Sequence, residues 1–560
     1  MASDIKSQFA LLTAPGAPYE MEEVEIFGRP CRSFKNAPAT LRALFEEARS
    51  DAEFFVYLDE RLTFEQCWQH ACTLAHIMVN DYGVQKGDRV AISMRNYPEW
   101  VISFMAATSI GAIACALNAL WQSDDIAHAL GDATPKVLVI DQERVNRMPH
   151  DGLPDAMHII AVRSDKIPDA LAAKTSHWQS LMAKIDKDTM PPVDMHPNDD
   201  ALMLYTSGST GHPKGAISCH RNVLNALLSW ELDLQAALGN GLVSLPTQDR
   251  QAATLLGVPL FHVTGSHAVF LSSYRAQRRC VSMYKWDVAE AVRLIETEQI
   301  TQFVAPAAMT GDLADYAVEN DCNISSLQVV GGGGAPRAPE QVARIKSDID
   351  SRPNTGWGMT ETNAIGTAII GEDYLERPAS SGRVSAVLDI RIVDENGHVL
   401  PAGERGELQI CGGSIIRGYW NRPDANAETF DGNWLRTGDV AYLDEDGFVF
   451  IVDRIKDLVI RGGENIGCGA VEAALLEYPD IVEASVYGVP DDRLGEEVGA
   501  TIFCENEIDR DALDGFLRGR LAHFEVPRYL QVETEPLPRT ASGKILKREL
   551  RAAAIDRLGK

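Results

Sequence analysis

The chain has 560 residues, too many for one compact core, and at roughly 150 residues per domain we expect about four folding units. Hydrophobic residues make up 45% and charged residues 24% of the sequence, a balance that excludes disordered, collagen-like and polytopic membrane chains. The 52 basic and 80 acidic side chains give a formal net charge of −28. This charge argues against nucleic acid as a partner, so any bound anion requires a local cluster of positive groups.

The cysteines and the apolar segments favour a reduced cytoplasm and no integral membrane segment. The ten cysteines are scattered without a C-x-x-C pair, which indicates neither a zinc site nor a disulfide framework. Met1 to Tyr19 contains no apolar core of signal-peptide length. Trp100 to Trp121 carries no charge and is long enough to span a bilayer. Polar residues interrupt it, however, and we expect a buried helix followed by a buried strand.

Most of the first 340 residues alternate short apolar strands with helical patterns, which is typical of a parallel α/β sheet. Strands are predicted at Arg89–Met94, Val137–Ile140 and Ala201–Tyr205. An apolar helix follows Pro98, and another helix is predicted to begin near His220, after a loop rich in Ser, Thr and Gly.

The pattern changes after about residue 380. Short strands at Leu388–Val393, Gly406–Cys411 and Phe448–Val452 are separated by turns such as Glu395-Asn396-Gly397. This spacing predicts a small antiparallel barrel or sheet. The chain after Asp453 is predicted to form a last α+β domain.

Three loops have the composition of a phosphate or nucleotide site. The first, Y-T-S-G-S-T-G-H-P-K-G from Tyr205 to Gly215, offers backbone N–H groups and the charge of Lys214. It is not a Walker loop, because Gly215 follows Lys214. A polar strand-to-helix turn explains its composition equally well.

The second loop, G-G-G-G-A-P from Gly331 to Pro336, would allow close approach of a flat ligand, with a flexible linker as the alternative. In the third, G-W-G-M-T-E, Trp357 could stack on a base, Thr360 could donate to a phosphate and Glu361 could hold Mg²⁺. Trp357 could equally be a core residue.

Three more segments follow: Thr437-Gly438-Asp439, D-R-I-K-D from Asp453 to Asp457, and P-R-T-A-S-G-K from Pro538 to Lys544. In this order, the six segments resemble the adenylate-forming superfamily, in its acyl- and aryl-CoA synthetase branch. The resemblance runs from about residue 35 to residue 551. It implies an α/β fold, with a large N-terminal domain of two doubly wound sheets plus a small distorted β-barrel, and a small mobile α+β C-terminal domain. The implied domains are residues 1–452, which bind AMP and the acyl group, and a lid at 453–560 with its hinge near 453–457.

The resemblance also implies the chemistry. ATP and Mg²⁺ would activate a fatty or aryl carboxylic acid as acyl-AMP with release of pyrophosphate, and the thiol of coenzyme A would then displace AMP. Implied catalytic residues are Thr206, Thr360, Glu361 (also the metal ligand), His262 and the mobile Lys544. Implied cofactor-binding residues are Ser207, Gly208, Ser209, Thr210, Gly211 and Lys214 at the phosphates, Gly333, Gly334, Ala335 and Trp357 at the adenine, Asp439 and Arg454 at the ribose, and Gly462 and Gly463 in the second half-reaction.

Elementary electrostatics agrees with these roles. A carboxylate that attacks a phosphate is opposed by Coulomb repulsion, which the metal and Lys544 would offset. The mixed anhydride must be protected from water until the thiol arrives, so a lid that presents two faces in turn is expected. Lys456 matches the hinge position of the family.

The acid is harder to predict. His262 stands where amino-acid-activating members carry an Asp, which disfavours an amino acid substrate, although a buried structural histidine is also consistent. Ser266 stands where some long-chain synthetases carry a gating Trp. Ala305, Ala307, Ala308 and Met309 suggest a pocket for an alkyl or aryl tail. Gly467-Cys468-Gly469 departs from the family, which usually has a Pro here, and Cys468 would be an exposed thiol if it faced the tunnel.

The expected partners are a small carboxylic acid, ATP and coenzyme A, with a homodimer left open. One alternative is an acyl-AMP ligase that delivers its product to a carrier-protein phosphopantetheine. The other is a non-catalytic family member, against which the joint presence of Lys214, Glu361, Asp439 and Lys544 argues.

Overall fold

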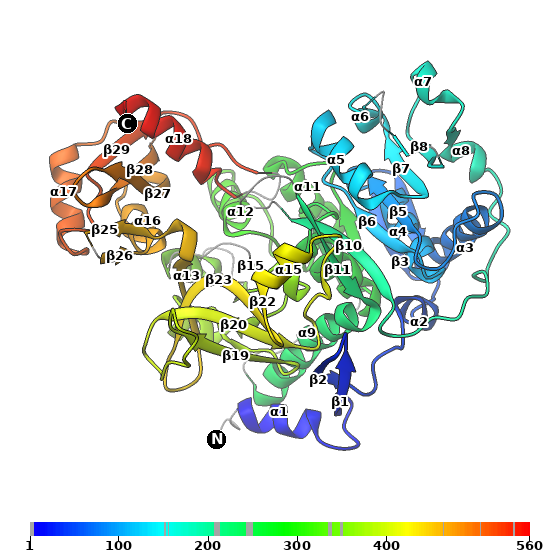
Figure 1. Ribbon diagram of the computed structural model, residues 1–560, viewed down its shortest axis with the longest axis horizontal. Helices are drawn as coiled ribbons and strands as arrows, with labels where there is room; N and C mark the ends of the chain where they lie inside the picture. Colours follow the sequence, from blue (N-terminus) through cyan, green and yellow to red (C-terminus); the bar gives the residue numbers. More distant parts are fainter. Residues whose placement is uncertain are drawn as a thin grey trace.

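The computed structural model describes residues 5–149, 153–154, 156–206, 213–241, 250–333, 339–347, 351–462, 464–504, 506–540 and 544–559. Within these residues the strands form one two-stranded hairpin and four larger sheets. The hairpin consists of β1 (Met21–Ile26) and β2 (Arg29–Phe34). Figure 1 shows the chain from its blue N-terminal part to a red helix at the C-terminus.

The first large sheet has eight strands, and the six from β10 to β9 are parallel. Its order is β21 (Gly418–Tyr419), β11 (Lys214–Cys219), β10 (Asp200–Thr206), β6 (Ile113–Ala116), β5 (Arg89–Ser93), β7 (Val137–Asp141), β8 (His158–Val162) and β9 (Thr175–His177). The three strands predicted for this region are β5, β10 and β7. Strand β11 was not predicted, because it begins with Lys-Gly, residues that are depleted in strands.

The second large sheet has nine strands with a parallel centre. Its order is β18 (Arg383–Val384), β17 (Thr367–Ile370), β16 (Arg352–Gly356), β15 (Val329–Gly333), β14 (Gln302–Val304), β12 (Ala253–Leu256), β13 (Arg279–Ser282), β3 (Glu53–Tyr57) and β4 (Glu60–Thr63). Two parallel sheets in the N-terminal part confirm the predicted doubly wound architecture.

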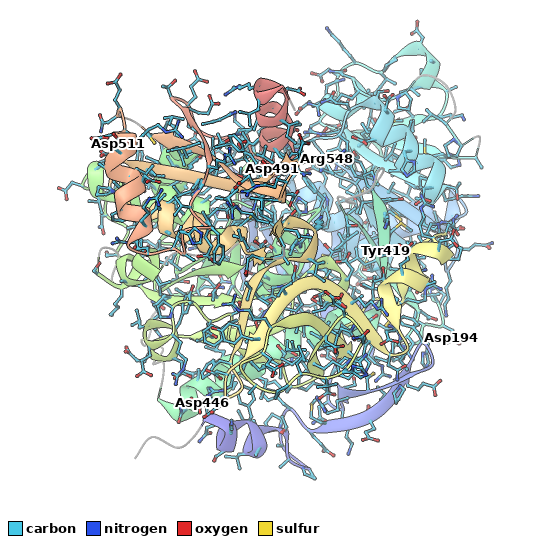
Figure 2. The ribbon with its side chains drawn as sticks, turned by 60° about the vertical axis from the view of Figure 1, so that its left-hand side comes forward. Asp194, Tyr419, Asp446, Asp491, Asp511 and Arg548 are labelled. Carbon is cyan, nitrogen blue, oxygen red and sulfur yellow. The ribbon has the colours of Figure 1, made fainter. Side chains whose placement is uncertain are left out.

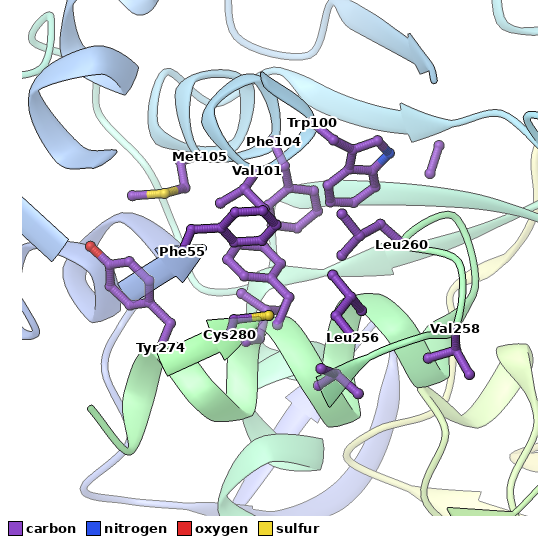
Figure 3. Packing of buried hydrophobic residues seen from close by; sticks show 14 of the residues in the cluster. Phe55, Trp100, Val101, Phe104, Met105, Leu256, Val258, Leu260, Tyr274 and Cys280 are labelled. Atoms are coloured by element: carbon purple, nitrogen blue, oxygen red, sulfur yellow. The ribbon is translucent and has the colours of Figure 1, made fainter. Parts of the chain in front are cut away.

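Helix α4 (Pro98–Ser109) lies between the two sheets: all twelve residues are buried, and it contacts β5 and β6 of one sheet and β3 of the other. Proline at the first helical position favours the start of the helix. The rings of Trp100 and Phe104 stack at 5.4 Å in the core drawn in Figure 3. The charge-free segment is therefore the predicted buried helix followed by the buried strand β6. Among the described residues, no helix has both the length and the apolar character needed to cross a membrane.

A third sheet of five antiparallel strands follows: β19 (Leu388–Val393), β20 (Gly406–Gly412), β23 (Trp434–Leu443) and β22 (Phe430–Asp431), with β24 (Val449–Arg454) paired to β23. The path of the described strands ends at β19 and β22, and no pairing of β19 with β22 or β24 closes it, so this part is an open sheet instead of a closed barrel.

The fourth sheet contains only strands from the end of the chain. They are β26 (Glu464–Ile466), β25 (Val459–Arg461), β28 (Gly495–Cys504), β27 (Ile481–Asp491) and β29 (Tyr529–Glu533). Helices α16 (Cys468–Leu476) and α18 (Lys547–Leu558) pack on β27. Figure 1 shows this unit in orange and red beside the rest of the molecule, as the prediction of a separate α+β lid requires.

The remaining helices connect these strands. They are α1 (Ile5–Thr13), α2 (Leu41–Glu47), α3 (Phe64–Asn80), α5 (Ser123–Ala133), α6 (Gln142–Val145), α7 (Asp169–Ala172), α8 (Trp178–Leu181), α9 (His220–Asn240), α10 (Ser272–Arg275), α11 (Val288–Glu298), α12 (Ala307–Glu319), α13 (Pro339–Ser347), α14 (Glu372–Glu376), α15 (Pro423–Thr429) and α17 (Arg510–Arg518), with the π-helix η1 (Thr264–Leu271) and the 3₁₀ turns η2 (Thr360–Thr362) and η3 (Ile455–Asp457). Helix α9 begins at the predicted His220.

Candidate active site

A cavity of about 1120 Å³ lies where the two large sheets, the third sheet and the C-terminal unit meet. Thr206 ends β10, Lys214 begins β11, and Gly333 and Gly356 end the parallel strands β15 and β16. Lys544 of the C-terminal unit completes the wall. Ligands of open α/β sheets bind outside the carboxyl ends of the strands, and this cavity occupies that position.

Glu361 is a buried carboxylate on the cavity wall, in the turn η2 that follows β16. The hydroxyl of Tyr419 donates to its Oε1 at 2.6 Å. Burial raises the pKa of Glu361, and the bond from Tyr419 lowers it in part. No arginine or lysine of the described part of the chain forms an ion pair with Glu361, so its negative charge is directed at the cavity.

Tyr419 also contacts the first loop. The ammonium of Lys214 lies 5.2 Å from the centre of the Tyr419 ring, within the range of a cation–π interaction. Figure 2 labels Tyr419 on the yellow segment in the middle of the molecule. The sequence analysis did not identify this tyrosine, because nothing in its local sequence marks it and Glu361 lies 58 residues away in the chain.

Asp439 and Arg454 face each other across β23 and β24, where they are register partners. The Nε of Arg454 lies 3.2 Å from Oδ1 of Asp439, and the indole N–H of Trp357 donates to Oδ2 at 2.7 Å. Burial raises the pKa of Asp439, and Arg454 lowers it. The two predicted ribose residues are therefore held together in one ion pair.

Trp357 is not among the described residues that line the cavity. It packs against both the main core and the third sheet. The structure thus gives it a positioning role toward Asp439, and stacking on adenine stays a prediction.

Lys544 reaches the cavity from the C-terminal unit, where its N–H donates to Thr540 Oγ1 at 3.2 Å. Its side chain is open to the cavity but surrounded by protein, and desolvation and Arg454 lower its pKa. The charges of Asp439 and Glu361 raise the pKa of Lys544 and so offset part of this decrease. The predicted mobile lysine therefore lies beside the predicted metal and ribose residues.

His262 lines the same cavity, in the loop before the π-helix η1. Burial and the neighbouring Lys544 lower its pKa to about 4. His262 is therefore neutral at physiological pH and contributes no charge to the binding of the acid.

The glycine run after β15 has a role within the sheet itself. A Cβ on Gly331 would lie 1.6 Å from Oδ1 of Asn354, and one on Gly333 would lie 2.5 Å from the carbonyl oxygen of Gly356. Close packing of β15 and β16 therefore requires these glycines, whatever ligand binds beside them.

Most predicted site residues that the structure describes converge on the cavity. Thr206, Lys214, His262, Gly333, Thr360, Glu361, Arg454 and Lys544 line it. Ser207, Gly208, Ser209, Thr210, Gly211, Gly334, Ala335 and Gly463 lie outside the described residues. Gly462 is described and does not line the cavity.

The expectation about the residues of the tail pocket turns out differently. Val304 and Pro306 form the cavity wall at β14, and the expected Ala305, Ala307, Ala308 and Met309 do not line it. Ala305 alternates with Val304 along the chain and is buried away from the cavity. The thiol of Cys468 is also buried, 2.9 Å from the carbonyl oxygen of Asp457.

Comparison with known proteins agrees with this geometry. Residues 44–420 match the model of the AMP-binding enzyme family, and residues 470–544 match that of the AMP-binding enzyme C-terminal domain. The chain is 30% identical to a long-chain-fatty-acid–CoA ligase of Mycobacterium tuberculosis, over 88% of this chain and 93% of the relative. It is 33% identical to a feruloyl-CoA synthase of Amycolatopsis sp, over 84% and 89%.

Among solved structures, the chain is similar to o-succinylbenzoate CoA synthetase of Bacillus subtilis in complex with an acyl-adenylate intermediate, with a TM-score of 0.76 and 25% identity over 92% of this chain and 98% of that one. A structure of the same synthetase in complex with ATP and magnesium ion has the same TM-score and identity, and covers 92% and 99%. The two family models together include the cavity residues Thr206, Glu361 and Lys544. The chain therefore belongs to the family of AMP-binding enzymes.

Proposed function

We propose that this chain is an ATP-dependent acyl-CoA ligase, an acid–thiol ligase that forms AMP. The observation that supports the proposal most strongly is that Lys544, from the C-terminal unit, lies in one cavity with Glu361 and beside the Asp439–Arg454 pair. The relatives named as CoA ligases and synthases are consistent with the same overall reaction.

The cavity residues fit ATP and Mg²⁺. Mg²⁺ in nucleotide sites is usually held by one or two carboxylates together with the phosphates. Glu361 is such a carboxylate, buried, without an ion-pair partner among the described residues, and open to the cavity. When bound, Mg²⁺ would neutralise charge on the phosphates. Lys214 and Thr206 would contact the phosphates, and Asp439 with Arg454 would hold the ribose.

In the first half-reaction, the carboxylate of the acid attacks the α-phosphate of ATP, and pyrophosphate leaves. Lys544 would bind the carboxylate and an α-phosphate oxygen together, which offsets their mutual repulsion. Thr360, on the cavity wall beside Glu361, would donate its hydroxyl hydrogen to the same phosphate. The protein then works by alignment and charge, without a covalent intermediate on the enzyme.

In the second half-reaction, the thiol of coenzyme A would attack the acyl carbonyl, and AMP would leave. In this structure Lys544 lines the cavity, whereas Gly462, which would act in this step, does not. The C-terminal unit must therefore rotate between the two steps, and the residues 453–457 are the proposed hinge of domains 1–452 and 453–560.

The test is a panel of fatty and aryl carboxylic acids, assayed for pyrophosphate release with ATP and Mg²⁺. Coenzyme A should raise the turnover severalfold and convert the acid to its thioester, identified by mass spectrometry. Acid-dependent pyrophosphate release that coenzyme A leaves unchanged would contradict the ligase and favour an acyl-AMP ligase. No release with any acid would contradict adenylation itself.

A further inference from the structure

The cavity extends well beyond the predicted nucleotide site, along one face of the second sheet. Gln302, Val329 and Arg352 are register neighbours near the amino ends of β14, β15 and β16, and all three line the cavity. Gly333 and Gly356 are register partners at the carboxyl ends. Along β15 and β16, the residues at the amino ends lie four residues from the glycines at the carboxyl ends, which is ~13 Å at the rise of a β-strand. This extension, which we call the tail arm, has the length needed for the tail of an acid.

The wall opposite the sheet is formed by α9 and η1. Trp230, Asp233 and Leu234 lie on one face of α9, at the i, i+3 and i+4 spacing, and line the cavity. Thr264 and Ala268 of η1 line it beside them. Apart from Asp233, the side chains of this wall are apolar or only weakly polar, as for an alkyl or aryl tail.

Arg278 lines the tail arm just before β13 begins. Its Nη1 donates to Oε1 of Gln302 at 2.7 Å, so the guanidinium reaches over β12, which separates β13 from β14. Burial lowers the pKa of Arg278. Gln302 is a neutral partner, and it orients the guanidinium without cancelling its charge.

The charge of Glu231 acts on Arg278 from a distance and raises its pKa in part, without an ion pair between them. Glu231 of α9 forms its ion pair with Arg275. No carboxylate of the described residues lies within ion-pair distance of Arg278 or of Arg352, the second arginine in the tail arm. A chain with a net charge of −28 has a large excess of carboxylates. A buried cation without an ion-pair partner costs free energy. A ligand that carries a carboxylate would supply the missing partner of Arg278 and offset this cost.

Asp233, on the opposite wall, does not supply the missing charge. Burial raises its pKa to about 7, and its Oδ2 is buried without a hydrogen-bond partner. Near neutral pH a large fraction of this carboxyl is therefore protonated. Because a protonated carboxyl is a hydrogen-bond donor, it is compatible with an anion in the tail arm.

We propose that this enzyme selects acids whose tail ends in a second carboxylate, and that Arg278 determines this specificity by binding that carboxylate. The inference rests on the proposed ligase activity and specifies its substrate class. A guanidinium that Gln302 already orients can donate two parallel hydrogen bonds to a carboxylate, a geometry that lysine cannot offer. The reacting carboxylate would lie at Lys544 and the second one at the far end of the tail arm.

The experiment compares straight-chain monocarboxylic acids with α,ω-dicarboxylic acids over the same range of lengths, together with aryl acids that do or do not carry a second carboxylate. Pyrophosphate release gives kcat and KM for each acid. At the best length, we expect the wild type to prefer the diacid by roughly ten- to hundredfold in kcat/KM, the effect of a hydrogen bond to a charged group. Arg278→Gln should lose this preference through a higher KM for the diacid, with kcat nearly unchanged and the matched monoacid unaffected.

Arg293→Gln is the control, because Arg293 is an exposed arginine that pairs with Glu290 and lies outside the cavity wall. It should keep the preference for diacids. Calorimetric binding of the best diacid to the wild type and to Arg278→Gln gives a readout that is independent of turnover, and thermal melting checks the folding of each variant.

Equal kcat/KM for monoacids and diacids at every length would overturn the inference and leave the ligase proposal intact. Loss of the preference in Arg352→Gln but not in Arg278→Gln would overturn the assignment to Arg278. If no acid is turned over, the ligase proposal fails. The inference is then overturned as well if the wild type binds no diacid, or if Arg278→Gln binds the diacid as tightly as the wild type does.

Discussion

The hydroxyl of Tyr419 donates to Glu361 at 2.6 Å, while the ring of the same tyrosine lies 5.2 Å from the ammonium of Lys214. One side chain therefore connects the proposed metal ligand with the proposed phosphate ligand. The bond from Tyr419 also opposes the rise in the pKa of Glu361 that burial produces. Tyr419 is thus a positioning residue whose hydrogen bond favours the ionised form of Glu361.

Replacing Tyr419 by Phe removes this bond and keeps the ring. We expect the pKa of Glu361 to rise and adenylation at limiting Mg²⁺ to fall by roughly tenfold, as for a lost hydrogen bond to a charged group. Excess Mg²⁺ or a higher pH should recover part of the rate. The measurement is pyrophosphate release as a function of Mg²⁺ at two pH values. Glu361→Gln should weaken the Mg²⁺ dependence more strongly, and an unchanged Mg²⁺ dependence in both variants would remove Glu361 from the metal site.

Lys544 should set an alkaline limit on adenylation. Its pKa lies below the ordinary lysine value of 10.5 because of desolvation and Arg454. The protonated form is the one that offsets the repulsion, so the rate should decline as the pH rises through this lowered pKa. Lys544→Ala should nearly abolish adenylation but largely spare thioester formation from supplied acyl-adenylate. Equal loss in both half-reactions would show that Lys544 has another role.

Lys456 lies in the turn η3 at the proposed hinge, and it lines the cavity together with Lys544. Proline at this position fixes φ and removes an N–H, so movement between two lid positions should be restricted. In Lys456→Pro we expect acyl-adenylate formation to survive, since the structure already presents Lys544 to the cavity, and thioester formation to fall severalfold or more.

The two half-reactions are measured separately in Lys456→Pro, and thermal melting confirms that the variant is folded. Lys456→Ala is the control that leaves the backbone free, and both of its half-reactions should stay close to those of the wild type. Normal thioester formation in a folded Lys456→Pro would place the hinge elsewhere.

Asp233 should make the protein less stable as the pH rises. Its pKa is about 7 in the folded protein and ~3.9 in an unfolded chain, so the folded state binds more protons between these values. The free energy of unfolding should therefore decrease from about pH 4 to about pH 7 and change little above. Asp233→Asn should remove this effect and stabilise the protein at neutral pH by up to about 4 kcal/mol.

Melting temperatures of wild type and Asp233→Asn near pH 5 and near pH 8 test the sign. The gain should be larger near pH 8. Asp194→Asn changes an exposed carboxyl, labelled in Figure 2, and should have no comparable effect. A larger gain near pH 5 would mean that Asp233 is stabilised as a carboxylate, contrary to its burial.

The elements that could be predicted from the sequence are those whose signal is local. Strands β5 and β7 are short apolar runs, α4 begins with a proline and carries no charge after Glu99, and α9 begins at His220. The order of the glycine- and hydroxyl-rich loops gave the family, and through it Glu361, Asp439 and Lys544, because each residue lies within a short recognisable segment.

The pairing of distant residues required the tertiary structure. Tyr419 meets Glu361, the indole of Trp357 meets Asp439, and Arg278 meets Gln302, each across separate strands or turns. Strand register and the packing of the C-terminal unit decide which side chains share a wall, and neither is encoded in a local pattern. The sequence by itself therefore determined the family and predicted the site residues. Only the tertiary structure decided that Arg278, at the far end of the cavity, has no ion-pair partner among the described residues, because ion pairs form between residues that are distant in the sequence.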